Sequence, residues 1–268
     1  MGATARDENA WWTIHRGASP IIGTAIHDGH HVRDDVVSKM TVAEDERLRE
    51  EDPFTAMMIG DLRNQIIVHR SRFEVDLNRP RESAVYLRPE QAWGMKIWRK
   101  TPSRATLESC LVVHDAYYSM LETYLRGVVA QYGSFVVLDV HSYNHLRDGP
   151  TAKATHPDIA PEINIGTFSI DRNRWNPIVE AFTSFARDFD FLGRRLDVRE
   201  NIAFQGRGEQ TRFIHQQFRS NGCAIAIEFK KFFMDEWTGV PDLEGIAALR
   251  ALVAGSVPVL EKALKEVS

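Results

Sequence analysis

Residues 136–143 constrain the fold of this chain more than any other segment, because a run of apolar, mostly β-branched residues leads directly into Asp-x-His-Ser. This pattern predicts a buried strand whose carboxyl end carries polar side chains. Asp139 and His141 are two residues apart and would face the same side of that strand. Ligands bind outside the carboxyl ends of strands in open α/β sheets, so His141 is placed for chemistry. The alternative is a structural histidine bonded to a neighbouring aspartate.

A second predicted strand, residues 19–26, ends in the histidine-rich sequence His-Asp-Gly-His-His. Imidazole is the commonest metal ligand in proteins, so three histidines directly after a strand favour a metal site over a solvated loop. His27 and His30 can converge if Gly29 allows the chain to turn tightly, and His31 would then point elsewhere.

A third predicted strand, residues 66–69, leads into an arginine-rich segment at residues 70–81. In an extended continuation, Phe73, Val75 and Leu77 would face one side, and the polar residues between them would face the other. Arginines held by a scaffold suit a planar carboxylate, which they can bind with two parallel hydrogen bonds. A structural ion-pair network is the alternative interpretation.

The fourth strand end carries Glu228, which follows the apolar run that begins at Cys223. A carboxylate there is costly to bury unless it has partners, and we favour a catalytic role over a structural salt bridge. Histidines, a free carboxylate and fixed arginines at four strand ends match metal-assisted hydrolysis with zinc as the metal. The predicted zinc ligands are His27, His30 and His141, which leave one position for water.

Other polar side chains at these strand ends have predicted roles in the same reaction. Glu228 would accept a proton from the water and pass it to the leaving amine, and Arg72 would stabilise the oxyanion. Asp76 or Asp139 would orient a ligating imidazole. The residues predicted to bind the substrate, with Asn78 and Arg79 clamping its carboxylate, are Asn78, Arg79, Arg70, Tyr143, Gly166 and Thr167.

The composition limits the partners and the compartment that we expect. A formal net charge of −4 gives no electrostatic reason to expect nucleic acid or an anionic membrane. Residues 1–9 lack the apolar core of a signal peptide, and we expect no apolar run that approaches a membrane span. We therefore expect a cytoplasmic protein with one catalytic domain over residues 1–268, of which residues 1–10 form a flexible segment.

The remaining pattern is helical, apart from one long connection. Residues 144–161 are too many for a simple turn, which predicts an active-site loop. The predicted helices cover residues 41–51, residues 54–62 with Asp52 as N-cap, residues 107–128, residues 171–191 with an interruption near Pro177, and residues 243–267.

The polar segments together resemble one known family. The sequence Ser-Arg-Phe-Glu-Val-Asp-Leu-Asn-Arg-Pro at residues 71–80 is similar to the Ser-Arg-Tyr-x-x-Asp-Leu-Asn-Arg-Pro segment of N-formylglutamate amidohydrolases. Residues 26–29 resemble their Pro-His-x-Gly, with Ile26 in place of proline. Residues 227–236 resemble their final strand and Tyr-Met-x-Glu tail. The resemblance runs from about residue 20 to residue 236.

These amidohydrolases are themselves similar to zinc carboxypeptidases and aspartoacylases, and the resemblance implies a three-layer α/β/α fold with a mixed central sheet. It also implies hydrolysis of an N-acyl amino acid, with His27 and His141 as ligands and Glu228 as base. Arg72, Asn78 and Arg79 would contact the substrate by the same analogy. Where carboxypeptidases have a glutamate ligand this chain has His30, so either a three-histidine site forms or water fills that place.

Two other functions remain open at this level. A carboxypeptidase or deacylase that acts on a larger substrate would use residues 144–161 to line an open groove. A metal- or carboxylate-binding protein without catalysis would keep the histidines and arginines but would not need Glu228. Because Glu228 is present at a strand end, we favour the enzyme, with N-formyl-L-glutamate as the expected substrate.

Overall fold

The computed structural model describes residues 10–267, so nearly all of the segment expected to be flexible, residues 1–10, lies outside the described residues. The centre of the fold is a seven-stranded sheet with the order β1-β3-β2-β4-β7-β5-β6. The strands are β1 (Trp12–His15), β2 (Ile21–Ala25), β3 (Asn64–Val68), β4 (Phe135–Tyr143), β5 (Ile163–Gly166), β6 (Val198–Glu200) and β7 (Gly222–Lys230).

The sheet is mixed, as predicted. Strands β3, β2, β4 and β7 run parallel to one another, whereas β1 is antiparallel to β3 and β5 is antiparallel to β7. The carboxyl ends of β2, β4 and β7 therefore meet at one edge. In the register of β4 and β7, His141 lies opposite Glu228, which brings two of the predicted site residues side by side.

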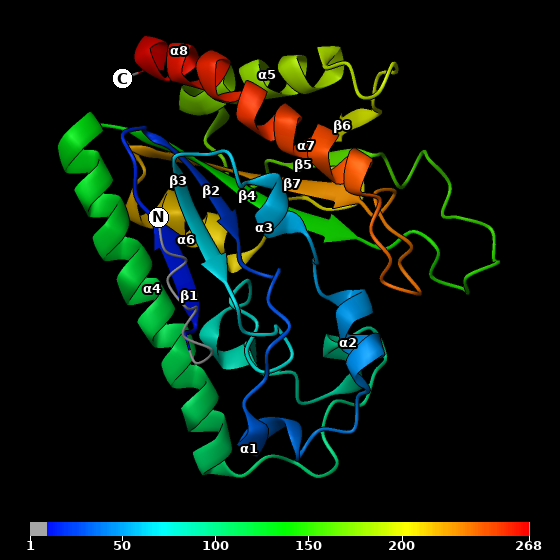
Figure 1. Cartoon of the computed structure of the whole chain (residues 1–268). Helices are drawn as coiled ribbons and strands as arrows, with labels where there is room; N and C mark the ends of the chain where they lie inside the picture. Colours follow the sequence, from blue (N-terminus) through cyan, green and yellow to red (C-terminus); the bar gives the residue numbers. More distant parts are fainter. Residues whose placement is uncertain (1–9, 268) are drawn as a thin grey trace, which may run out of the picture.

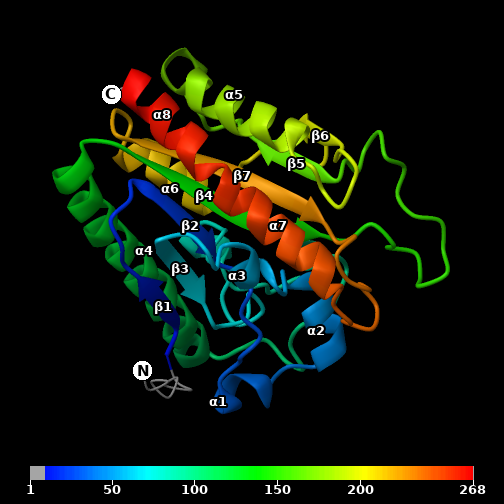
Figure 2. The same cartoon turned by 45° about the horizontal axis from the view of Figure 1, so that its top comes forward.

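Helices cover both faces of the sheet and complete the three layers (Figures 1 and 2). Helices α5, α7 and α8 pack on one face, and α4 and α6 pack on the other. The helices are α1 (Asp34–Val37), α2 (Glu44–Glu50), α3 (Thr55–Met58), α4 (Arg104–Tyr132), α5 (Arg172–Asp188), α6 (Glu209–Gln217), α7 (Leu243–Gly255) and α8 (Val257–Val267), with short 3-10 turns η1 (Arg81–Ser83) and η2 (Pro89–Gln91).

The continuous apolar run of β4 packs against helices on both faces of the sheet, because side chains alternate along a strand. Leu138 and Val140 belong to the core under α5, α7 and α8, whereas Val137 belongs to the core under α4 and α6. Asp139 and His141 have the same parity as Val137 and so lie on the α4 side of the sheet. All nine residues of β4 are buried.

Several local predictions are wrong. Asp52 does not cap a helix, because α3 begins only at Thr55 and its N-cap is Phe54, whose φ is 70°. Residues 70–81 do not continue β3 as a strand but form turns. Helix α5 runs through Pro177 without interruption.

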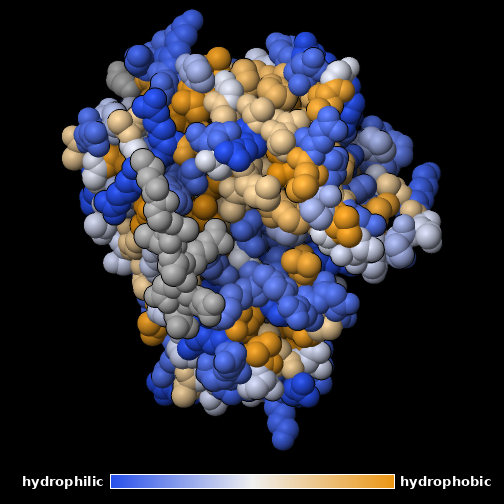
Figure 3. Space-filling model, in the orientation of Figure 1, coloured by the Kyte–Doolittle hydropathy of each residue, from blue (hydrophilic) through white to orange (hydrophobic). Residues whose placement is uncertain are grey.

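The C-terminal segment, Leu243–Val267, corrects a further expectation, because it is long and apolar enough to cross a membrane by length and composition. Core helices of soluble proteins also meet that test. Here the segment divides at Ser256 into α7 and α8, and residues such as Leu249 and Leu260 belong to the core of the sheet. Apolar residues also gather on the outer surface where α7 lies (Figure 3).

His215 on α6 links that helix to the sheet and predicts a pH-dependent stability. Its Nε2 accepts a hydrogen bond from the Ala224 amide at 2.9 Å, and its Nδ1 lies 2.9 Å from the Ser169 hydroxyl. Burial lowers the pKa of His215 to about 4, so the folded protein keeps this ring neutral. The unfolded chain takes up a proton below about pH 6.5, so the free energy of unfolding falls between pH 6.5 and 4, by up to about 3 kcal/mol from this group.

Urea unfolding of the metal-free protein at pH 7 and pH 5 measures this effect. We expect His215→Gln to show a smaller loss of stability between the two pH values than the parent protein. The matched control is His156→Gln, because His156 is exposed on the loop after β4. Equal pH dependence in His215→Gln and the parent protein would contradict the prediction.

Candidate active site and metal centre

A cavity of about 440 Å³ opens where β2, β4 and β7 end, at the edge of the sheet that the sequence indicates. His27 follows β2, His141 lies on β4 and Glu228 lies on β7, and all three side chains line this cavity. Asp52 enters the same cavity from the segment between α2 and α3. Four ionisable side chains from distant parts of the chain therefore meet in one cavity.

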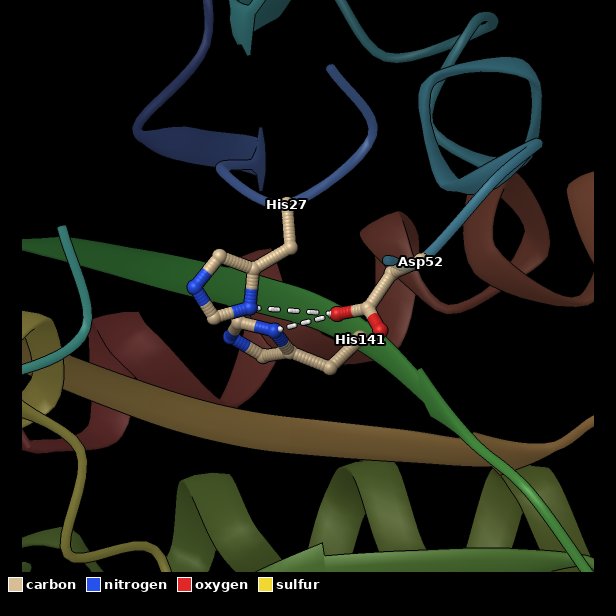
Figure 4. Close-up of side chains that lie close together, drawn as sticks. All are labelled: His27, Asp52 and His141. Atoms are coloured by element: carbon tan, nitrogen blue, oxygen red, sulfur yellow. Dashed lines mark hydrogen bonds and ion pairs between the residues drawn. The ribbon is translucent and has the colours of Figure 1, made fainter. Parts of the chain in front are cut away.

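His27, Asp52 and His141 form a compact cluster within the cavity (Figure 4). One oxygen of Asp52, Oδ2, lies 3.3 Å from Nδ1 of His27 and 3.0 Å from Nδ1 of His141. Their ligand atoms all lie within 4.8 Å of one another, and the three residues are buried. Two imidazoles and one carboxylate are a ligand set that catalytic zinc sites use, so these donors fit a divalent metal.

The second nitrogen of each imidazole faces another buried carboxylate. Nε2 of His27 lies 2.7 Å from Oδ1 of Asp76, and Nε2 of His141 lies 3.2 Å from Oδ1 of Asp139. Metal-ligating histidines commonly have this arrangement, because the carboxylate fixes the ring and its tautomer. Asp76 or Asp139 was expected in this position from the sequence, and in the structure each of them lies beside one ring.

The electrostatics of the cluster favour a positive charge at its centre. Burial alone would raise the pKa of Asp52, but hydrogen bonds with His141 and His27 outweigh it and hold this pKa below the usual range. Burial would lower the pKa of His141, but Asp139 and then Asp52 raise it well above its ordinary value. A divalent cation bound by these residues would supply that positive charge.

The structure does not bring the three predicted histidine ligands together, because Asp52 and not His30 clusters with His27 and His141. Nδ1 of His30 lies 2.5 Å from the carboxylate of Glu51, its Nε2 lies 3.2 Å from that of Glu44, and His30 is absent from the cavity lining. Gly29 fixes the path of the backbone between His27 and His30. It packs so closely on the backbone after β3 that a Cβ would lie 2.3 Å from the carbonyl carbon of His69.

Glu228 and Arg72, the predicted catalytic residues, both line the cavity. Burial raises the pKa of Glu228 to about 7, despite the opposing effect of His141 beside it. The guanidinium of Arg72 is fixed by three partners: the Tyr86 hydroxyl at 3.1 Å, the Glu50 carbonyl at 3.3 Å and the Asp76 carboxylate at 3.0 Å. A base with a pKa near neutrality and an immobile cation thus share one space.

The residues predicted to bind the substrate separate into two groups. Asn78 and Tyr143 line the cavity. Arg79 is turned away, because its Nη2 donates to the Gln91 carbonyl at 2.9 Å and its guanidinium lies over the ring of Tyr86. The others that lie outside the cavity are Arg70, which contacts His31, Gly166, which packs on Gly206, and Thr167, which contacts Glu200.

The cavity also contains charged residues that sequence reasoning missed. Arg147 from the loop after β4 and Arg207 from the loop before α6 line it, as does Lys231 at the end of β7. Burial lowers the pKa of Lys231 to about 8. The place of Lys231 in the cavity could have been inferred from its position directly after the strand that carries Glu228. The places of Asp52, Arg147 and Arg207 could not, because they depend on how distant loops fold onto the sheet.

Residues 19–234 match the family model described as N-formylglutamate amidohydrolase. The chain belongs to this family. A search of curated proteins finds no match to this sequence.

Solved structures of similar fold cover nearly the whole chain. The crystal structure of N-formylglutamate amidohydrolase from Ralstonia eutropha JMP134 has a TM-score of 0.73 and 14% sequence identity, over 96% of this chain and 97% of that one. A gene product from Agrobacterium tumefaciens has a TM-score of 0.67 and 15% identity, over 97% of this chain and 96% of that one. These likenesses confirm the predicted fold.

Proposed function

We propose that this member of the family is a zinc-dependent amidohydrolase that cleaves the amide bond of N-formyl-L-glutamate or a closely related N-acyl amino acid. The observation that carries the proposal is the cluster of His27, Asp52 and His141 beside Glu228 in one cavity. The similar Ralstonia protein is named an N-formylglutamate amidohydrolase, which supports the choice of substrate.

His27, Asp52 and His141 would hold the metal, through Nδ1 of each imidazole and the Asp52 carboxylate. When bound, a zinc ion would act as a Lewis acid and lower the pKa of a water molecule. Asp76 and Asp139 keep both imidazoles in the orientation that directs Nδ1 at the shared centre.

Glu228 is the general base of this proposal. Its pKa of about 7 lets it take a proton from water near neutral pH and return that proton to the departing amine. Arg72 cannot move toward the substrate, since Tyr86, Glu50 and Asp76 hold it. A charge fixed in this way can stabilise the oxyanion without reorganising during the reaction.

Carboxylate recognition is assigned to other arginines than the sequence suggested. Arg79 is engaged elsewhere, whereas Arg147 and Arg207 line the cavity from its two loops. Arg147 lies 3.5 Å from the Glu50 carboxylate, and Arg207 lies over the ring of Phe168. These guanidinium groups suit the two carboxylates of an N-acyl glutamate.

A test of this function compares zinc-loaded protein with a chelated sample in the hydrolysis of N-formyl-L-glutamate. We expect formate release from the loaded protein and its loss on chelation. N-formyl-L-leucine serves as the matched substrate without a side-chain carboxylate, and it should react more slowly. If zinc binds but formate is not released from N-formyl-L-glutamate, that substrate is excluded and other N-acyl amino acids and short peptides become the substrates to test.

One observation favours a second candidate, a deacylase that acts on a larger substrate. Three partly exposed apolar side chains, Trp93, Ile202 and Phe204, line the cavity. They would contact an acyl group larger than formyl. Faster release of a longer acyl group than of formate from otherwise identical N-acyl glutamates would select this candidate.

A further inference from the structure

The segment that carries Asp52 is not part of a regular element, although a metal ligand needs a fixed position. It follows the end of α2, where Glu51 is extended with φ of −78° and ψ of 175°. The last carbonyl groups of a helix have no partner within that helix, and they need hydrogen-bond donors from elsewhere. In this protein those donors are side chains of the cavity.

Lys231 supplies two of these hydrogen bonds. Its ammonium donates to the carbonyl of Arg49 at 2.6 Å and to that of Glu51 at 2.7 Å. Between them, the carbonyl of Glu50 accepts from Arg72 at 3.3 Å. Three consecutive carbonyls that lead to Asp52 are thus held by cationic side chains that line the cavity.

Lys231 is itself held at the sheet edge that carries the rest of the site. It directly follows β7, and its amide donates to the carbonyl of Tyr143, the last residue of β4, at 2.9 Å. The side chain is only 1% exposed. A buried ammonium is costly unless it has hydrogen-bond partners, and the two carbonyls are such partners. A rigid link therefore connects the strands that carry His141 and Glu228 to the segment that carries Asp52.

We propose that Lys231 is a positioning residue of the metal site: its ammonium ties the backbone before Asp52 to the ends of β4 and β7, so that the Asp52 carboxylate lies between the two histidines. The inference rests on the metal site of the proposed function and not on its substrate. Asp52 is separated from His27 by 25 positions in the sequence. Their relative placement must therefore come from tertiary contacts such as this one.

The test is the affinity of the full chain for Zn²⁺, measured by competition with a chromogenic chelator after the protein has been stripped of metal. We expect Lys231→Met to weaken Zn²⁺ binding by roughly 10- to 100-fold, the effect typical of losing a partner that orients a metal ligand. The Co²⁺-loaded variant should also show an altered visible absorption spectrum, because the Asp52 carboxylate is displaced. A role confined to folding stability would leave both readouts unchanged.

The neighbouring lysine provides a matched control. Lys230 donates to the Ala160 carbonyl at 3.1 Å and does not contact the Asp52 segment, so Lys230→Met should bind Zn²⁺ like the parent protein. Lys231→Gln keeps a hydrogen-bond donor without the charge. If Lys231→Met does not fold, this variant tests whether Lys231 positions the metal site. We expect Lys231→Gln to bind Zn²⁺ more weakly than Lys230→Met.

Equal Zn²⁺ affinity in Lys230→Met and the folded Lys231 variants would overturn the inference. A parent protein that binds Zn²⁺ but does not cleave N-formyl-L-glutamate would refute only the proposed substrate, and the Lys231 comparison would still stand. A parent protein that does not bind Zn²⁺ would refute both the metal site and the role of Lys231.

Discussion

Glu228→Gln is expected to lower turnover of N-formyl-L-glutamate by roughly 10²- to 10⁴-fold, the range that general acid–base catalysis contributes. Glutamine has nearly the same shape as glutamate but cannot accept a proton from water. Zinc content should not change, because the clustered ligand atoms belong to His27, Asp52 and His141. The measurement is kcat for formate release together with the zinc content of the same preparation.

The dependence of turnover on pH provides a second readout for Glu228. Burial raises the pKa of its carboxyl to about 7. A base acts only when it is deprotonated, so turnover should fall as the pH drops through this pKa, and a bound cation would move that fall to lower pH. The residual activity of Glu228→Gln should lack this acid limb.

Glu200→Gln is the matched control, because Glu200 is also a strand glutamate but lies on β6 and pairs with Arg172 at 2.8 Å. It should retain the parent turnover. Normal activity in Glu228→Gln would eliminate the general-base role, and loss of zinc in that variant would show that Glu228 serves the metal site instead.

The parts of the site that could be predicted from sequence lie on strands with continuous apolar runs. Strands β4 and β7 are buried on both faces, so their extents follow from the continuous apolar runs. The same-face placement of Asp139 and His141 follows from the period of two. The register then brings His141 opposite Glu228. The regular hydrogen bonding of the sheet fixes the positions of side chains at the ends of its strands.

The wrong prediction for residues 70–81 has a different physical origin. Residues 70–81 alternate polar and apolar side chains like a half-buried strand, and Phe73, Val75 and Leu77 are indeed buried, but they are buried by successive turns. An alternating pattern reports burial and does not determine the backbone conformation. Arg79 lies outside the cavity for the same reason, because its side chain follows the turn toward Gln91.

Asp52 could not be assigned from sequence because its place depends on contacts that are distant along the chain. Asp-Pro is a common beginning of a helix, and this local pattern favoured an N-cap. The actual position is set by the hydrogen bond from its own amide to the His27 carbonyl at 2.9 Å and by the contacts of Lys231 and Arg72 with the preceding residues. Local preference and tertiary structure disagree at this residue, as is common at functional sites.

Asp52→Asn is expected to weaken Zn²⁺ binding strongly, whereas His30→Ala is expected to leave it nearly unchanged. Asp52 is the anionic member of the cluster, and its replacement by asparagine leaves no negatively charged side chain among the three ligands. Removing one partner of a buried ion pair costs about 3–5 kcal/mol, so Zn²⁺ binding should weaken by roughly 10²- to 10⁴-fold. His30 pairs with Glu51 and Glu44 outside the cavity, so His30→Ala should bind Zn²⁺ within about twofold of the parent protein.

The two variants separate the structural assignment from the three-histidine alternative. Chelator competition at one fixed pH compares both proteins under the same competition from protons for the imidazole nitrogens. Weak binding in His30→Ala together with strong binding in Asp52→Asn would restore His30 as the third ligand. The expected opposite result would mean that a residue from the α2–α3 segment completes the site, and that the His-Asp-Gly-His-His sequence contributes only its first histidine.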